Sequence, residues 1–146
     1  MTDQAKKQLL PWTTRACDAS VQSGSLLITP AGGQPFLTNA KLNATGPVEV
    51  KVRIRTAADG TGRLQWRTEG QATFPVTGQT TSFDVRGGDW QELAVPLAVE
   101  GRLVHVRLFP PVQEKPVEID WIEIGPVGAD DEEHERWDFQ ETAEPN

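Results

Sequence analysis

The stretch Val48-Glu-Val-Lys-Val-Arg-Ile-Arg-Thr56 decides the fold class of this 146-residue chain. Val48, Val50, Val52 and Ile54 alternate with charged residues, so apolar side chains recur at every second position. This period of two is typical of a β-strand that buries one face and exposes the other. We therefore read the surrounding sequence as part of an all-β domain.

Short runs of the same kind recur between turn signals, with the spacing of a sandwich or a barrel. The run Arg63–Glu69 follows the first strand after the glycine-containing loop Ala58–Gly62, and we expect the two strands to form a hairpin. No segment predicts a helix. Further strands are expected at Ser25–Thr29, Pro35–Leu42, Thr80–Val85, Trp90–Leu97, Arg102–Phe109 and Val117–Ile124.

The net charge of −7 comes entirely from the end of the chain. Eight acids and one base, Arg136, lie after residue 129, whereas acids and bases balance before it. This distribution argues against nucleic acid or an anionic membrane as a partner. The sequence also contains no apolar run long enough to span a membrane and no signal peptide at its start.

These features divide the chain into a lead-in at residues 1–8, a β-sandwich module at 9–125 and an acidic tail at 126–146. Composition favours disorder in the tail. However, Trp137 and Phe139 lie two residues apart and are able to pin a short terminal strand to the sandwich. Cys17 is the only cysteine, so no disulfide can form within the chain.

The sequence contains almost no motif that is typical of catalysis, and we predict no catalytic residue and no metal site. The two histidines, His105 and His134, lack metal-ligand spacing, and no phosphate loop or nucleophile elbow is present. Glu118 and Asp120 are better interpreted as fold-stabilising than as an acid–base pair. For Asp120, hydrogen bonding is favoured over ligation of calcium, which needs roughly six to eight oxygens.

Two kinds of side chain are candidates for ligand contact. Trp66 and Trp121 share strand faces with apolar residues, so we expect both in the core. Trp90 begins a strand at the rim of the domain, where the sequence fits a core plug and a ligand platform about equally. Phe74 lies in a loop, and an exposed ring at either position would suit stacking on the C–H face of a sugar.

Basic residues form the second candidate. Either they are an ordinary solvated face balanced by neighbouring acids, which we favour, or they form a surface for carboxylate or sulfate groups, to which arginine binds in bidentate fashion. The residues expected on one side of the hairpin, with two from another strand, are Lys51, Arg53, Arg55, Arg63, Arg67, His105 and Arg107.

The order of these motifs resembles the galactose-binding-like, jelly-roll modules at the C-termini of bacterial, planctomycete-type sulfatases and other glycan-processing enzymes. Phe109 departs from that pattern, in which Asp often precedes Pro. The resemblance is carried by Gly24–Ile28, Pro35–Leu37, Val52–Ala58, Leu64–Thr68, Trp90–Leu93, Val106–Pro110 and Glu118–Ile122.

The resemblance implies a jelly-roll β-sandwich of two antiparallel sheets and a non-catalytic carbohydrate-binding module of a larger enzyme such as a sulfatase. Partners would be a glycan, with sulfated and acidic glycans among the candidates, and the parent catalytic domain in cis. It also implies an extracellular or periplasmic location, and a structural calcium would lie near Asp120. The alternative is a structural domain that docks to its parent catalytic domain. The expected ligand contacts are Trp90, Phe74, Arg55, Arg67 and Arg107.

Overall fold

The computed structural model describes residues 12–15, 17–22, 25–30, 35–74, 78–128 and 134–139. The predicted lead-in at residues 1–8 and the acid cluster at 130–133 lie outside the described residues. None of the described segments forms a helix that could cross a membrane. The strands are β1 (Thr13–Arg15), β2 (Cys17–Gln22), β3 (Ser25–Pro30), β4 (Phe36–Asn39), β5 (Ala44–Thr45), β6 (Val48–Arg55), β7 (Gly60–Thr68), β8 (Thr80–Val85), β9 (Gln91–Leu97), β10 (Arg102–Phe109), β11 (Val117–Pro126) and β12 (Glu135–Trp137).

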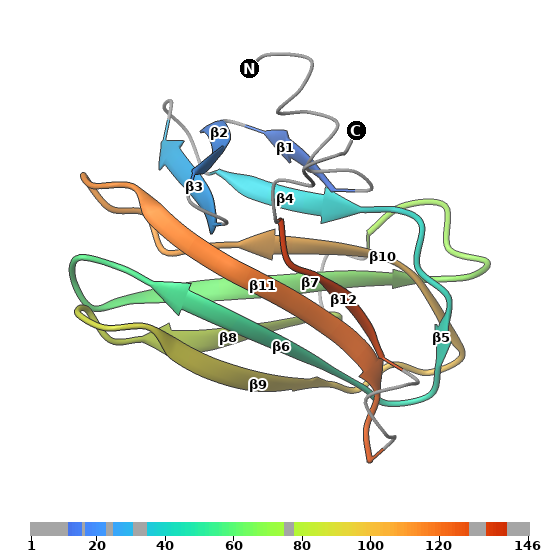
Figure 1. Ribbon diagram of the computed structural model, residues 1–146. Helices are drawn as coiled ribbons and strands as arrows, with labels where there is room; N and C mark the ends of the chain where they lie inside the picture. Colours follow the sequence, from blue (N-terminus) through green and yellow to red (C-terminus); the bar gives the residue numbers. More distant parts are fainter. Residues whose placement is uncertain are drawn as a thin grey trace, which may run out of the picture.

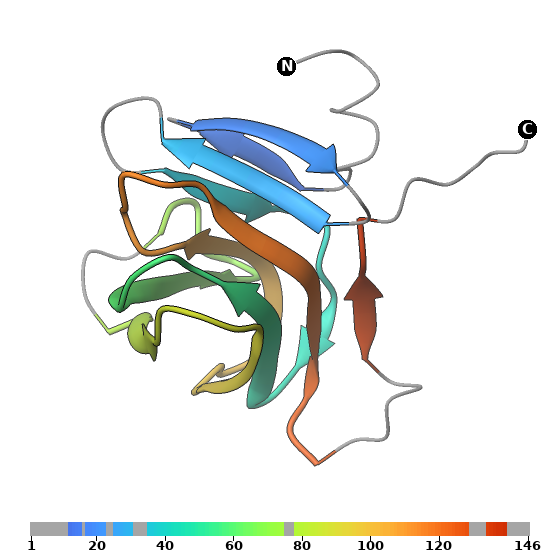
Figure 2. The ribbon, with the colours of Figure 1, turned by 60° about the vertical axis from the view of Figure 1, so that its left-hand side comes forward.

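The strands form two antiparallel sheets that pack face to face (Figures 1 and 2). The first sheet has the order β1-β4-β10-β7-β8, with β5 also pairing with β10. The second sheet has the order β2-β3-β11-β6-β9, with β12 also pairing with β11. The predicted all-β, jelly-roll sandwich of two antiparallel sheets is confirmed.

The predicted hairpin between Val48–Thr56 and Arg63–Glu69 is wrong. Strand β6 pairs with β9 and β11 in the second sheet, whereas β7 pairs with β8 and β10 in the first. The short connection after Thr56 crosses from one sheet to the other, and the Thr56 hydroxyl donates a hydrogen bond to the Ala58 carbonyl there. Alternation fixes which face of a strand is buried but does not identify its neighbour.

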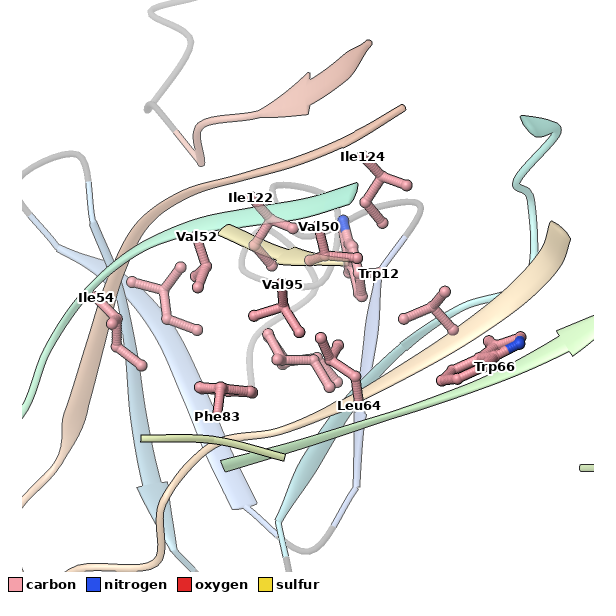
Figure 3. Close-up of a cluster of buried hydrophobic side chains, with 14 of the residues drawn as sticks. Trp12, Val50, Val52, Ile54, Leu64, Trp66, Phe83, Val95, Ile122 and Ile124 are labelled. Atoms are coloured by element: carbon pink, nitrogen blue, oxygen red, sulfur yellow. The ribbon is translucent and has the colours of Figure 1, made fainter. Parts of the chain in front are cut away.

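The alternating residues of β6 supply one wall of the core. Val48, Val50, Val52 and Ile54 are each at most 1% exposed. Side chains of β7, including Leu64 and the predicted core residue Trp66, face them across the sandwich (Figure 3). Burial of each such aliphatic side chain contributes about 1.5–3 kcal/mol, so the core holds the two outer faces in fixed positions.

Trp121 does not lie in the core as predicted. A bulge between Ile119 and Trp121 shifts the register of β11 against β6, so Ile119 and Ile122 both point inward. A bulge inserts one extra residue and reverses the alternation beyond it. Trp121 is therefore half-buried on the outer face, where the Arg136 guanidinium lies 4.2 Å from its ring centroid.

The tail returns to the sandwich as β12, which lies beside the second half of β11 (Figures 1 and 2). Trp137 makes an edge contact with Trp12 at 5.5 Å between ring centroids, and Phe139 is buried. The carboxylate of Glu123 accepts hydrogen bonds from His134 and Arg136. Backbone pairing with β11, aromatic packing against the core and the Glu123 ion cluster thus attach the tail to the second sheet.

Candidate functional site

The structure separates the five predicted ligand contacts into two groups. Arg67, Phe74 and Arg107 line a hollow of about 400 Å³ on the outer face of the first sheet. Trp90 and Arg55 instead lie together at the second sheet, with the Arg55 guanidinium 4.6 Å from the Trp90 ring centroid. The crossing between β6 and β7 causes this separation, because it places the two strands in different sheets.

The floor of the first-sheet hollow is built by strand pairing. His105 of β10 lies opposite Arg67 of β7 in the register, and Arg107 follows two positions along β10. Residues two apart on a strand share a face, and directly paired residues have Cβ atoms about 5 Å apart. The sheet therefore brings Arg67, His105 and Arg107 together on one surface. We call the hollow that they line with Ala72, Thr73 and Phe74 the basic hollow.

Phe74 forms the aromatic wall of the basic hollow. Its ring centroid lies 4.0 Å from the Arg107 guanidinium carbon and 4.6 Å from the His105 ring centroid. Phe36 of β4 approaches the same guanidinium at 5.3 Å. Such cation–π contacts contribute about 0.5–1 kcal/mol at exposed sites, and they keep the Arg107 guanidinium beside the aromatic rings. Phe74 itself is half-buried, so part of its ring remains accessible.

The loop that carries Phe74 is fastened by Gln71. The Gln71 side-chain oxygen accepts hydrogen bonds from the Thr68 backbone nitrogen at 2.9 Å and the Thr68 hydroxyl at 3.0 Å. Its amide nitrogen donates to the Gln79 side-chain oxygen at 2.9 Å. The Arg67 guanidinium donates to the Gln71 carbonyl. These bonds fix the loop three residues before Phe74, which makes Gln71 a positioning residue.

The basic hollow is electropositive. None of the ion pairs among the described residues involves Arg67 or Arg107. The Arg107 Nε is buried and has no hydrogen-bond partner among these residues. Burial, followed by the nearby charge of Arg15, lowers the pKa of Arg107. An anionic group bound here would supply both the missing acceptor and the missing counter-charge.

His105 lies at the centre of this charge. Its Nε2 is 2.6 Å from the Thr38 hydroxyl on β4. Burial, together with the charges of Arg67 and Arg107, lowers the pKa of His105 from its ordinary value of 6.5. The free protein therefore favours the neutral imidazole, whose Nε2 shares one hydrogen bond with the Thr38 hydroxyl.

Arg55 is neutralised in its own sheet. It makes a bidentate contact with Glu118, at 3.0 Å from Nε and 2.9 Å from Nη2. This hydrogen bonding raises the pKa of Arg55, the opposite of the effect on Arg107. Trp90 lies under Arg55 and Arg53 as a half-buried ring. A hollow of about 320 Å³ beside this pair is lined by Leu27, Arg55, Thr56, Ala57, Gly88, Lys115, Pro116 and Glu118.

The carboxylates considered for catalysis or calcium binding pair with arginines. Asp120 lies 3.1 Å from the Nε of Arg53, and Glu118 binds Arg55. No group of three or more His, Cys, Asp or Glu side chains is arranged for a metal within the described parts of the chain. The Arg53 guanidinium beside Asp120 is compatible with the hydrogen-bonding role that we favoured for this carboxylate. Its positive charge would repel a cation bound there. Calcium near Asp120 stays an untested expectation.

Sequence reasoning missed several residues of the basic hollow. Thr38 and Phe36 come from β4, about 70 residues before β10. Alternation in the predicted strand Pro35–Leu42 places both on one face but does not identify the strand beside it. Gln71 carried no signal, because its role depends on Thr68 and Gln79 reaching one side chain.

The chain matches no family model, and no curated protein is significantly similar to it. Several solved structures share its architecture. One is the C-terminal CBM6 module of LamC, a marine laminarinase from Zobellia galactanivorans. At 18% identity it has a TM-score of 0.52, covering 77% of this chain and 90% of that one.

A second is the CBM22-2 xylan-binding domain of Xyn10C from Paenibacillus barcinonensis, with a TM-score of 0.54 at 14% identity, covering 86% and 97% of the two chains. A third is the CBM6cm-2 module of lichenase 5A from Cellvibrio mixtus, in complex with cellotriose, with a TM-score of 0.51 at 11% identity and coverage of 77% and 88%. The structural neighbours are thus carbohydrate-binding modules. At these identities the similarity shows the jelly-roll β-sandwich.

Proposed function

We propose that this protein is a non-catalytic carbohydrate-binding module that binds an acidic or sulfated glycan in the basic hollow. One observation carries the proposal: Arg67 and Arg107 lie beside an accessible aromatic ring, with no carboxylate paired to either among the described residues. A sugar ring offers C–H groups to Phe74, and its carboxylate or sulfate offers planar acceptors to the guanidinium groups. The carbohydrate-binding structural neighbours support the class of ligand.

The direct test is calorimetric titration with three oligosaccharides of equal length, one neutral, one made of hexuronic acids and one sulfated. We expect measurable binding of the two anionic probes, and weaker binding of the neutral one. Lower salt should strengthen only the anionic interactions, because salt screens exposed charges. If none of the three probes binds at low salt, the proposed function is wrong.

Phe74→Ala locates the site. Removal of the ring should weaken every bound probe roughly tenfold, the scale of about 1.4 kcal/mol for an aromatic contact. Arg102→Gln is the matched control, since Arg102 lies on the same strand β10 but forms an ion pair with Glu69. The control should bind like the unchanged protein, and equal losses in both variants would argue against the basic hollow.

The same proposal places the module beside the catalytic domain of a glycan-processing enzyme. Two of the structural neighbours are parts of named proteins. One is a module of LamC, a laminarinase, and the other is the xylan-binding domain of Xyn10C. A sulfatase as the parent, and an extracellular or periplasmic location, rest on the sequence resemblance alone. Sequencing the reading frame around these 146 residues tests the parent directly.

Docking to the parent domain is the second candidate, and it would use the surface around Trp90 and Arg55. That surface offers a half-buried ring and a neutralised arginine rather than an apolar patch. The exposed large hydrophobic residues in the described parts are Val112 and Val127, which lie beyond opposite ends of β11. Docking would therefore be polar, and Trp90→Ala should weaken it while leaving glycan binding intact.

A further inference from the structure

The environment of His105 has a consequence for how the basic hollow would select its ligand. We propose that His105 is a specificity-determining contact: when an anionic glycan binds, its imidazole takes up a proton from solvent and becomes a third cation facing the acidic group. The proposal rests on the proposed function and adds to it a rule for the dependence of affinity on pH. The neutral imidazole of the free protein is converted to an imidazolium in the complex.

The position of His105 is the first reason. The histidine lies across from Arg67 and two residues before Arg107, so all three side chains face the basic hollow. Thr38 holds its Nε2 from β4, and Phe74 contacts its ring edge. The Nδ1 makes no hydrogen bond with any residue that the structure describes. The ring is thus oriented by its neighbours, and its Nδ1 is left for a ligand; in the imidazolium this nitrogen donates.

The charges around His105 are the second reason. Strand β7 contributes Arg67, β10 contributes Arg107, and β4 contributes the neutral Thr38. The loop contributes the uncharged residues Ala72, Thr73 and Phe74. Among the residues that the structure describes, the charges that face the imidazole are positive, and they add to burial, the larger cause, in opposing its protonation. A carboxylate or sulfate between the two guanidinium groups would offset their repulsion of the imidazolium and add an attractive partner, although burial would still oppose the charge.

Linkage fixes the sign of the effect. Because the complex favours the protonated imidazole more than the free protein does, binding an anion requires proton uptake. Affinity should be greatest below the pKa of His105 in the free protein and should fall as pH rises through its higher pKa in the complex. Each unit of difference between the free and bound pKa corresponds to about tenfold in affinity. A neutral glycan brings no counter-charge, so its affinity should not gain from protonation.

The test is calorimetry on the full chain with the hexuronate and sulfated oligosaccharides and their neutral counterpart, from pH 5 to 8. Measurements at each pH in two buffers of different ionisation enthalpy report protons taken up on binding. Uronates are fully ionised above pH 5, given carboxyl pKa values of roughly 3.5, so uptake in this range belongs to the protein. We expect uptake with both anionic probes and affinity that falls roughly threefold to tenfold toward pH 8.

His105→Gln separates this proposal from the proposed function. Glutamine retains a hydrogen-bonding side chain beside Thr38 but cannot titrate, so anionic probes should still bind with neither proton uptake nor the pH dependence. His134→Gln removes the other histidine, on the opposite sheet, and should retain both. Binding without proton uptake, or uptake that survives His105→Gln, overturns this proposal alone. Absence of binding by every probe at every pH overturns the proposed function as well.

Discussion

The two outer faces of the sandwich carry similar cations, but these cations have different neighbours on the two faces. On the second sheet, Arg55 and Arg53 each face a carboxylate of β11, and Lys51 lies 4.0 Å from Glu123. On the first sheet, Arg67 and Arg107 face aromatic rings and a histidine. The charge of a face is decided by the strands that lie beside each other, and not by how many arginines one strand contains. On the second sheet these cations are paired with carboxylates, whereas Arg67 and Arg107 on the first sheet have no carboxylate partner among the described residues.

Removal of the central carboxylate of the second sheet should have the largest effect. Glu123 is 3% exposed and lies between His134, Arg136 and Lys51. Glu123→Ala should reduce the free energy of unfolding by about 3 kcal/mol, the lower end for a broken buried pair, because the 51% exposed Arg136 side chain can regain water. Chemical denaturation measures this loss. A change below about 0.5 kcal/mol, the usual size for a neutral surface site, would contradict the structural role of this cluster.

One arginine from each face gives the next comparison. Arg107→Ala should weaken binding of an anionic glycan roughly 30-fold, or about 2 kcal/mol, the value of a hydrogen bond to a charged group. The free energy of unfolding of the Arg107→Ala variant should change little, because burial disfavours the charged guanidinium that the substitution removes. Arg55→Ala should leave glycan affinity unchanged and reduce stability only slightly, since its pair with Glu118 is partly exposed. Calorimetric titration and thermal denaturation of both variants would sharpen the comparison, and a reversed pattern would break it.

A smaller loss is expected from the residue that positions the aromatic wall. Gln71→Ala removes the hydrogen bonds to Thr68 and Gln79 without removing a contact of the basic hollow. Phe74 should then be held less firmly, and glycan affinity should fall about threefold to fivefold, or roughly 1 kcal/mol for one net hydrogen bond. Gln113→Ala is the control, because Gln113 fastens a different loop through Ala58. Equal affinities of the Gln71 variant and the unchanged protein would show that the loop needs no such support.

The two histidines should give the smallest effect and the most direct contrast. Hydrogen bonds to Glu123 and then to the Pro126 carbonyl raise the pKa of His134, whereas burial and two arginines lower that of His105. Magnetic resonance titration of the two imidazoles from pH 4 to 9 should place them on opposite sides of the ordinary value of 6.5. Two histidines with the same pKa would remove the electrostatic difference between the faces.

The same titration predicts when β12 is held most firmly. The contribution of His134 is complete below its ordinary pKa and is lost as pH rises through the raised value. Burial opposes ionisation of Glu123, but hydrogen bonds from His134 and Arg136 prevail and lower its pKa. Its contribution is therefore present above the ordinary carboxyl pKa and is lost as pH falls through the lowered value. Hydrogen exchange at Glu135–Trp137 should be slowest in mildly acidic solution and faster at alkaline pH, after correction for intrinsic rates.

Sequence reasoning identified most of the residues of the candidate site, but it did not predict which of them lie together. Phe74, Arg67 and Arg107 were predicted as contacts, and the structure places them around one hollow. Trp90 and Arg55 were predicted with them and lie at the other sheet. Parity identified the outward side chains on most strands, since successive residues point to opposite faces, but it failed beyond the β11 bulge at Trp121. It did not identify the sheet to which each outward face belongs.

The sequence by itself determined the all-β class, the inward face of most strands and the absence of a disulfide within the chain, because alternation and composition are local properties. The tertiary structure decided the crossing between β6 and β7, the bulge that turns Trp121 outward and the pairing of β4 with β10. Those contacts join residues far apart in the chain, and their energies depend on which strands become neighbours. For that reason only the folded chain separates Arg55, which pairs with a carboxylate, from Arg67 and Arg107, which have no carboxylate partner among the described residues.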